Sequence, residues 1–430
     1  MYWEKDIETI SQDNLKKYQL EKFNLIIQRA RKSPFYKNRL KNIDKINSLD
    51  DIKDLPFTTK QDLRDNFPYG LLTVDLSEVV RLHSSSGTTG NPTVVLHTKN
   101  DIEEWSNLIA RSMYMTGVRK NDVFQNMMGY GLFTGGLGFH YGAEKLGVMV
   151  LPIGPGNSKR QIWFMQNFHT SVVHILPSYA LHLYSYFKEL NINPINDLNL
   201  KIFFIGAEPH SEEIRKKIEE LYNVKVFNSY GLSEMNGPGV AFECEYQNGL
   251  HIWEDNYYVE IINPDTGEVL PEGEEGELVL TTLKREAMPI IRYRTGDLTK
   301  ILPGECKCGR THKRLDRIKG RNDDMIIING VNIFPIQIEK TLMKISDIGN
   351  NYLIEIHKED YMDRLYIKVE INEKTFTGNL TTLDNLRKKL VEELKQEIGV
   401  TARIKLVEPG SIPVAQGKAR RVIDLRNKEG

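Results

Sequence analysis

The chain has 430 residues, which exceeds one ordinary domain and predicts two domains with ample length for a buried core. Its 57 basic and 58 acidic residues give a formal net charge of −1, so the composition gives no general attraction for nucleic acid or a membrane surface. The N-terminus has no basic leader with an apolar run, no stretch reaches about 18 consecutive apolar residues, and three cysteines are too few for a disulfide scaffold. These features predict a soluble, cytoplasmic protein.

Helix and strand patterns alternate through the first two thirds of the chain. Residues 1–60 have apolar positions at helical spacing and predict helices. Val172–Leu176, Lys201–Ile205 and Val224–Phe227 predict buried strands that are separated by helical segments. The alternation predicts a large α/β domain of several layers with mainly parallel sheets, in which ligands bind at the carboxyl ends of strands. The loops after Ile205 and Phe227 are therefore expected to contribute to a site.

The pattern changes after residue 322. Two short strand patterns, NYLIEIH and RLYIKVEIN, are followed by an amphipathic helix at Leu383–Ile398 and a strand at Ala402–Val407. These elements predict a smaller α+β domain. We therefore expect an N-terminal domain at residues 1–322 and a C-terminal domain at residues 323–430.

The segment SSSGTTGNPT at Ser84–Thr93 is the clearest local motif. Gly87 and Gly90 allow backbone N–H groups to approach an anion closely, and the hydroxyl side chains add donors. The segment lacks the GxxxxGK[ST] pattern of a Walker A loop. It is either a phosphate-binding loop or an ordinary turn rich in serine, threonine and glycine.

A second motif, NSYGLSEMNG at Asn228–Gly237, follows a predicted strand. Glu234 offers a hard carboxylate oxygen of the kind that Mg²⁺ prefers. Tyr230 offers a flat ring that could lie against a purine. The alternative interpretation is an ordinary strand-to-loop connection with a solvated glutamate.

Later segments carry single charged residues that suit a nucleotide. Asp297, in RYRTGDL, could accept hydrogen bonds from both hydroxyls of a ribose, and Arg321 could donate to the same sugar. Lys418 lies in a flexible, Gly-flanked segment near the C-terminus. The alternative interpretation is charged turns and a solvated lysine. Nearer the N-terminus, Tyr130 and Phe133 in an apolar, glycine-rich run are candidate walls of a substrate pocket, or else plain core.

All three cysteines of the chain fall in two segments. Cys306 and Cys308 share one loop, and Cys244 lies some sixty positions earlier. Three thiolates and one imidazole make a closed tetrahedral Zn²⁺ site of structural type. His251 and His312 compete for the fourth place, and we favour His251 because His312 would crowd the loop of Cys306. The alternative is free cysteines and surface histidines.

In this order the motifs resemble the adenylate-forming superfamily of acyl-CoA synthetases, adenylation domains and luciferases. That superfamily has a Ser/Thr/Gly loop, a YGxSE segment, a TGD, a GRxDD hinge and a distal lysine. Longer strings such as GYGLFTGGLGFHYGAE, SYGLSEMNGPGVAFEC and GVNIFPIQIE resemble the phenylacetate–CoA ligase family, from about residue 20 to the C-terminus. The phosphate loop departs from the family's GKP at Asn91, which removes one cationic phosphate contact.

The resemblance implies a role for individual residues. Lys418 is expected to contact the α-phosphate and the substrate carboxylate, Glu234 to hold Mg²⁺, and Asp323 to be the hinge of a mobile C-terminal domain. Tyr230 should lie against the adenine. The other residues implied in ATP or AMP binding are Ser84, Ser85, Ser86, Gly87, Thr88, Thr89 and Gly90 at the phosphates, Gly206, Ala207, Glu208 and Pro209 at the adenine, Asn228, Ser229, Gly231 and Ser233 in the YGxSE segment, and Asp297 and Arg321 at the ribose.

The implied activity joins an aryl carboxylic acid, with phenylacetate expected, to coenzyme A through an acyl-adenylate. Its small-molecule partners are the acid, ATP and CoA, with Mg²⁺ and a structural Zn²⁺ as metals. One alternative transfers the acyl group to a carrier-protein thiol. Another class, a zinc-dependent structural or nucleic-acid-binding module, is weakened by the near-neutral charge. The sequence leaves open the acid and the oligomeric state, for which a homodimer is one candidate.

Overall fold

The computed structural model describes residues 1–85, 92–321, 324–329, 331–359, 362–376, 380–413 and 421–426. The chain divides into two compact units, each assembled from separated segments. The first unit comprises Met1–Ile175, Asp197–Ala207 and Phe227–Ile318. The second comprises Leu176–Asn196, Glu208–Val226 and Lys319–Gly430.

A large mixed sheet forms the centre of the first unit. Its strand order is β13–β14–β9–β8–β7–β6–β5–β3–β4. The strands β4, β3, β5 and β6 run parallel, whereas β7, β8, β9, β14 and β13 pair antiparallel. The carboxyl ends of the parallel strands therefore meet at one edge. The bounds are β3 Val123–Asn126, β4 Met149–Leu151, β5 Val172–Ile175, β6 Ile202–Gly206, β7 Lys225–Leu232, β8 Gly237–Glu243, β9 Leu250–Ile252, β13 Ile301–Leu302 and β14 Arg314–Leu315.

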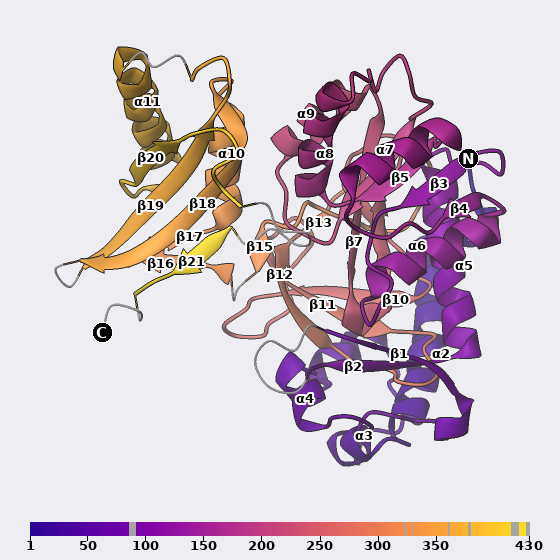
Figure 1. Ribbon diagram of the computed structural model, residues 1–430. Helices are drawn as coiled ribbons and strands as arrows, with labels where there is room; N and C mark the ends of the chain where they lie inside the picture. The colour runs from indigo at the N-terminus through magenta and orange to yellow at the C-terminus, as the bar shows by residue number, and fades with distance from the viewer. Residues whose placement is uncertain are drawn as a thin grey trace. The chain divides into compact units, whose positions relative to one another are not determined.

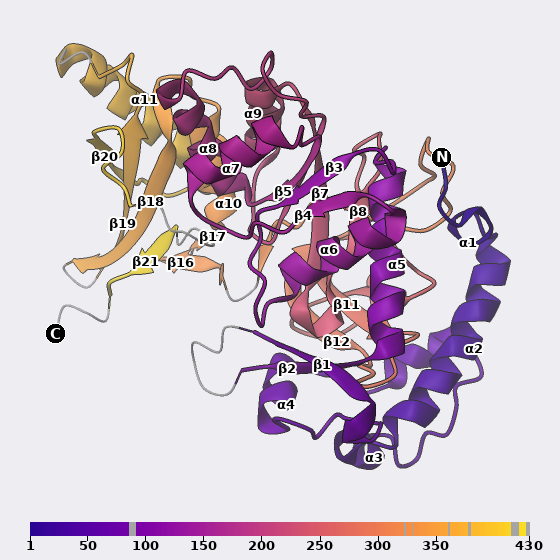
Figure 2. The same cartoon turned by 45° about the vertical axis from the view of Figure 1, so that its right-hand side comes forward.

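Five helices of the first unit, α2, α3, α4, α5 and α7, begin at side-chain caps. Ser11 caps α2, and Thr98 forms a capping box with Asp101 at the start of α5. Helices α5 and α6 lie side by side (Figure 2) because Gly142 of α6 leaves room for Ile109; a Cβ at Gly142 would be 2.3 Å from Ile109 Cγ2. The bounds are α1 Lys5–Glu8, α2 Gln12–Ala30, α3 Pro34–Arg39, α4 Lys60–Asp65, α5 Lys99–Met115, α6 Thr134–Leu146 and α7 Ser158–Asn167.

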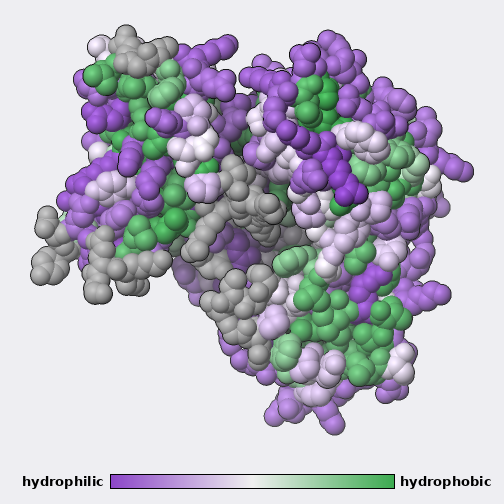
Figure 3. Space-filling model, viewed as in Figure 1, coloured by the Kyte–Doolittle hydropathy of each residue, from purple (hydrophilic) through white to green (hydrophobic). Residues whose placement is uncertain are grey.

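Two smaller antiparallel sheets complete the first unit. One is the hairpin of β1, Val79–Ser84, with β2, Val94–Thr98. Val80 and Leu82 are exposed on β1, and Figure 3 shows apolar side chains gathered over that strand. In the other, β11 pairs with β10 on one side and β12 on the other. The bounds are β10 Tyr257–Ile262, β11 Gly276–Thr282 and β12 Tyr293–Thr299.

The second unit has its own sheet and core. The sheet has the order β20–β19–β18–β21, with a long antiparallel β18–β19 hairpin at its centre (Figure 1). Helices α10 and α11 contact each other and pack with the sheet around Leu390, Leu394, Ile354 and Ile367. The bounds are α8 Pro177–Glu189, α9 Glu212–Tyr222, β15 Gly320–Arg321, β16 Ile326–Ile328, β17 Val331–Ile333, α10 Pro335–Met343, β18 Ile348–Glu359, β19 Met362–Ile371, α11 Leu380–Ile398, β20 Arg403–Val407 and β21 Val422–Asp424.

The predicted fold class is confirmed: an α/β region with a large sheet precedes a separate C-terminal α+β part. The three predicted strands lie within a residue or two of β5, β6 and the start of β7. The side chain of Ser211 caps α9 by accepting from Ile214 N. Among the described helices, none combines the length and apolar composition needed to cross a bilayer.

Candidate active site and metal centre

The two ends of the Ser/Thr/Gly loop are fixed to each other. Ser85 N donates to Thr93 O at 3.0 Å, and Thr93 N donates to Ser85 Oγ at 3.1 Å. The β1–β2 hairpin adds a further pairing, Ser84 with Val94. The hairpin thus holds both ends of the loop at one place. The predicted loop residues Ser86, Gly87, Thr88, Thr89 and Gly90 lie outside the described residues.

Glu234 lies at the base of this loop. It is buried in the short turn η3, Ser233–Met235, between β7 and β8. Thr93 Oγ1 donates to Glu234 Oε1 at 3.3 Å, although the two residues are 141 positions apart in the chain. The fold therefore brings together two motifs that lie far apart in the sequence. A carboxylate oxygen beside a phosphate loop suits Mg²⁺, which takes carboxylate and phosphate oxygens as ligands.

Tyr230 and Asp297 are in direct contact. Tyr230, on β7, donates through its hydroxyl to Asp297 Oδ2 at 2.5 Å. Asp297 lies on β12, where its backbone N donates to Thr295 Oγ1 at 3.0 Å. The residues expected at the adenine and at the ribose thus belong to one hydrogen-bonded cluster.

The remaining predicted nucleotide residues of the first unit pack closely around β6 and β7. A Cβ at Gly206 would lie 2.4 Å from Ser229 O, and one at Gly231 would lie 1.8 Å from Gly237 O, so neither position has room for a side chain. Asn228 N donates to Glu243 Oε2 at 2.7 Å. Ser233 opens the turn that carries Glu234, and Ala207 has a positive φ of 64°.

Other predicted residues belong to the second unit or fall outside the described chain. Glu208 Oε1 accepts from Ser178 N at 2.7 Å, and Pro209 follows it. Arg321 lies on the short strand β15. Asp323 and Lys418 are not among the described residues.

Tyr130 is held in place near the carboxyl end of β3. Its hydroxyl accepts from Asn126 Nδ2 at 2.9 Å and lies 3.3 Å from His140 Nδ1. Burial raises the pKa of Tyr130 to about 12, so the phenol is neutral at ordinary pH. Phe133 is the N-cap of α6 and is exposed. The two candidate wall residues thus differ, one anchored and one open to solvent.

The three cysteines and His251 form one compact cluster. All four ligand atoms lie within 4.8 Å of one another. Cys244 Sγ is 3.6 Å from Cys306 Sγ, and Cys308 Sγ is 3.2 Å from His251 Nε2. Sulfur atoms on a tetrahedral Zn²⁺ with bonds of about 2.3 Å would be roughly 3.7 Å apart. The donor set and its spacing therefore fit a structural zinc ion.

The thiols of Cys244 and Cys308 differ in acidity. A hydrogen bond from the Cys244 thiol lowers the pKa of Cys308 well below its usual range, and the same bond raises the pKa of Cys244. The ring of His251 is oriented like that of a metal ligand. Its Nδ1 lies 3.3 Å from His312 O, and its Nε2 faces the sulfur atoms.

His312 is turned away from the cysteines. Its Nε2 lies 2.9 Å from Ile7 O, to which it can donate, and its Nδ1 accepts from Glu254 N at 3.3 Å. Both ring nitrogens are therefore engaged by backbone groups. The structure brings His251, and not His312, into the cluster, as the sequence favoured.

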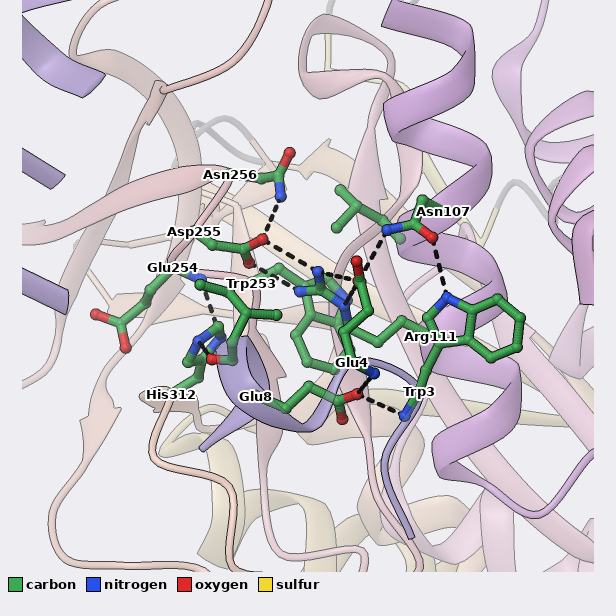
Figure 4. Close-up of polar contacts among 12 residues, drawn as sticks. Trp3, Glu4, Glu8, Asn107, Arg111, Trp253, Glu254, Asp255, Asn256 and His312 are labelled. Carbon is green, nitrogen blue, oxygen red and sulfur yellow. Dashed lines mark hydrogen bonds and ion pairs between the residues drawn. The ribbon is translucent and has the colours of Figure 1, made fainter. Parts of the chain in front are cut away.

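The N-terminal segment packs over the cysteine loop. Tyr2 Oη donates to Cys308 O at 2.9 Å, and Arg310 pairs with buried Glu8 at 2.7 Å. Beside this contact Arg111 lies between Glu4 and Asp255 (Figure 4), making a bidentate pair with the latter. The buried guanidinium of Arg111 is therefore paired with two carboxylates.

Sequence reasoning missed two residues that hold the turn of Glu234. Arg285 Nη1 donates to Glu234 O at 2.5 Å, and Tyr257 Oη donates to Met235 O at 2.9 Å. Both are buried. No pattern in the sequence around Arg285 distinguishes a buried arginine from a surface one.

Comparison with known proteins gives two family matches. Residues 29–283 match the model of the AMP-binding enzymes, and residues 330–426 match that of the AMP-binding enzyme C-terminal domain. Among curated proteins, the chain is 43% identical to a phenylacetate–coenzyme A ligase of Thermus thermophilus, covering 99% of this chain and 100% of that one. It is 42% identical to the enzyme of the same name from Escherichia coli, covering 99% of this chain and 98% of that one.

The fold is also similar to that of a solved ligase. A crystal structure of 2-hydroxyisobutyryl-CoA ligase in its postadenylation state, in complex with an acyl-adenylate (R3-HIB-AMP), gives a TM-score of 0.92 at 32% identity. The match covers 98% of this chain and 92% of that one.

Proposed function

Because the chain belongs to the AMP-binding enzymes and, within them, to the phenylacetate–CoA ligase family, we propose that phenylacetate is the acid it activates. The reaction class is ATP-dependent ligation of a carboxylic acid to CoA through an acyl-adenylate. A carboxylate oxygen attacks the α-phosphorus of ATP and pyrophosphate leaves. The CoA thiol then attacks the acyl carbonyl, its proton is lost to solvent, and AMP leaves.

The contact between Thr93 and Glu234 is the observation that carries the adenylation role. It places a buried carboxylate beside the fixed ends of the phosphate loop. We propose that Glu234 holds Mg²⁺ there, which would neutralise the charge that develops on the phosphates. Tyr230 and Asp297 would bind the adenosine, with Arg321 as a second ribose contact.

The role of the C-terminal domain in the reaction is also a proposal. Lys418 would donate to the α-phosphate and substrate carboxylate during adenylation, and Asp323 would be the hinge that removes it before the thiol attacks. Tyr130 is the better supported wall of the acid pocket because its ring is fixed by Asn126 and His140, whereas Phe133 is exposed.

We also propose that Cys244, His251, Cys306 and Cys308 bind one structural Zn²⁺. Its support is the closed set of four ligand atoms and the outer contact of His251 with His312 O. No step of the adenylation chemistry requires this ion. The cytoplasmic setting and a homodimer stay predictions.

A panel of acids tests the substrate. Purified protein is incubated with MgATP, CoA and phenylacetate, indoleacetate, benzoate or acetate, and AMP and acyl-CoA are quantified. We expect phenylacetate to give the highest kcat/KM, with equal amounts of AMP and phenylacetyl-CoA. A higher value for another acid would overturn the substrate. AMP formation that does not depend on free CoA would instead favour transfer to a carrier-protein thiol.

A further inference from the structure

Arg285 is a buried arginine with an unusual set of partners. Its side chain is 4% exposed, and its Nη1 donates to the backbone carbonyl of Glu234 at 2.5 Å. Within the described parts of the chain, Nε and Nη2 have no hydrogen-bond partner. Two other buried arginines pair with carboxylates: Arg111 pairs with Asp255 (Figure 4), and Arg292 donates to Glu260 through Nε and Nη2.

The backbone beneath Arg285 is firmly anchored. Asp101, at the N-terminus of α5, accepts from Glu286 N at 2.7 Å and from Ala287 N at 3.0 Å. The side chain of Thr98 also donates to Glu286 Oε2 at 2.9 Å. Arg285 therefore reaches the turn of Glu234 from a fixed base, and its guanidinium has little freedom to move away.

The turn that Arg285 contacts joins β7 to β8. It is a single 3-10 turn, Ser233–Met235, and Asn236 and Gly237 follow it with φ of 74° and 94°. A sheet ladder would fix the direction of a carbonyl, but here the carbonyls of Glu234 and Met235 are fixed by Arg285 and Tyr257. The hydrogen bond at the Glu234 carbonyl restrains the backbone of that residue, and a shift of this backbone would move the carboxylate.

We propose that Arg285 is a positioning residue for the adenylation step, which holds Glu234 so that its carboxylate faces the metal beside Thr93. The inference rests on the proposed magnesium role of Glu234. Hydrogen bonding alone does not account for an arginine here, because Nε and Nη2 are buried and have no partner among the described residues. A backbone contact behind a metal ligand, by contrast, affects metal binding directly.

The test uses the full chain and two substitutions, Arg285→Met and Arg285→Lys. Acid-dependent ATP–pyrophosphate exchange is measured over a Mg²⁺ titration at saturating ATP, together with thioester formation from supplied acyl-adenylate and the melting temperature. We expect Arg285→Met to raise the Mg²⁺ concentration for half-maximal exchange by about tenfold or more, as for other residues behind a metal ligand. Thioester formation and melting temperature should stay near wild type. Arg285→Lys should restore part of the Mg²⁺ response, because an ammonium can still donate to Glu234 O.

Arg111→Met is the matched control. It removes a buried arginine of the same unit and leaves buried Asp255 with Lys284, at 3.5 Å, as its charged partner, so it should lower the melting temperature while the Mg²⁺ response stays that of wild type. A wild-type Mg²⁺ response in folded Arg285→Met would overturn the proposal. If Arg285→Met does not fold, Arg285→Ala takes its place. The proposal is then overturned if Arg285→Ala and Arg285→Lys both show the wild-type Mg²⁺ response. Failure of the proposed function has another signature, since Glu234→Gln would then leave the Mg²⁺ response unchanged, or wild-type protein would show no acid-dependent exchange.

Discussion

Tyr230 donates its hydroxyl proton to Asp297 across the junction of two sheets, at 2.5 Å. The two residues are 67 positions apart, and each comes from a different motif. If Asp297 accepts from the ribose hydroxyls, the bond from Tyr230 fixes the carboxylate for that task and also holds the ring of Tyr230 in place. Under the proposed function, this part of the site would be organised before a nucleotide binds.

This pair gives the first prediction. Tyr230→Phe keeps the ring and removes one hydrogen bond, which is worth about 1 kcal/mol, so the KM for ATP should rise roughly fivefold. Asp297→Ala also removes the contacts to the ribose and should raise it considerably more. Steady-state kinetics with ATP varied check both, with the KM for the acid as the control. An unchanged KM for ATP in Asp297→Ala would remove this residue from the ribose site.

The second prediction separates the two half-reactions. If Lys418 contacts the α-phosphate and the substrate carboxylate as proposed, Lys418→Ala should slow adenylate formation by about 2–4 kcal/mol of transition-state stabilisation, because a cation between two anions is lost. Thioester formation from supplied acyl-adenylate should be largely spared. Pyrophosphate exchange and single-turnover thioester assays measure the two steps. Equal slowing of both would contradict a lysine that acts only in the first.

The third prediction concerns pH and Glu254, outside the active site. Burial raises the pKa of this carboxyl to about 7, although its Oε2 accepts from Lys313 N. In the unfolded chain the pKa of a glutamate is about 4.3, so the folded chain binds the proton of Glu254 more tightly. The free energy of unfolding therefore falls as the pH rises from about 4.3 through about 7. Glu254→Gln should remove that loss of stability, which is about 4 kcal/mol at most, at roughly 1.4 kcal/mol for each pKa unit between the unfolded and folded values.

Melting temperatures across pH measure the effect. Wild type and Glu254→Gln should melt alike near pH 4, and the variant should melt higher near pH 8. A difference that is the same at both pH values would mean that the substitution acts through packing and not through the proton.

Much of the fold followed from local patterns in the sequence. The buried strands β5 and β6 are short apolar runs next to helical segments, and Ser211 stands where an N-cap is required, so each could be located without tertiary information. Helix α8 begins at Pro177, because proline suits the first turn of a helix. The hairpins among β10, β11 and β12 were not predicted, since their pairing depends on contacts between distant residues.

The site was predictable in part for the same reason. Glu234 and Asp297 stand out because their motifs are local, but spacing along the chain does not say that Thr93 meets one and Tyr230 the other. Arg285 gives no local signal at all. For Arg111 a signal exists, since it follows buried Leu108 by three residues on α5 and so lies on the buried face.

The fourth prediction is that purified protein carries about one Zn²⁺ per chain. The ligands come from two segments, at 244–251 and 306–308, so the metal would clamp them together and its loss should lower the melting temperature. Cys306→Ser should lose metal and thermal stability together and keep measurable activity at low temperature. Elemental analysis, thiol titration and melting curves test this. Freely titratable thiols in a native protein without stoichiometric metal would exclude the site.

The last prediction identifies the fourth ligand. His251 Nε2 lies 3.2 Å from Cys308 Sγ, and its Nδ1 faces a backbone carbonyl, which is the arrangement of a metal-bound imidazole. His312 contacts Ile7 O and Glu254 N instead, so it supports the N-terminal segment. His251→Ala should therefore lose zinc, whereas His312→Ala should keep zinc and show only a lower melting temperature. Zinc content of the two variants, measured after removal of loosely bound metal, decides between them. Zinc that survives His251→Ala but not His312→Ala would keep the site and exchange its fourth ligand.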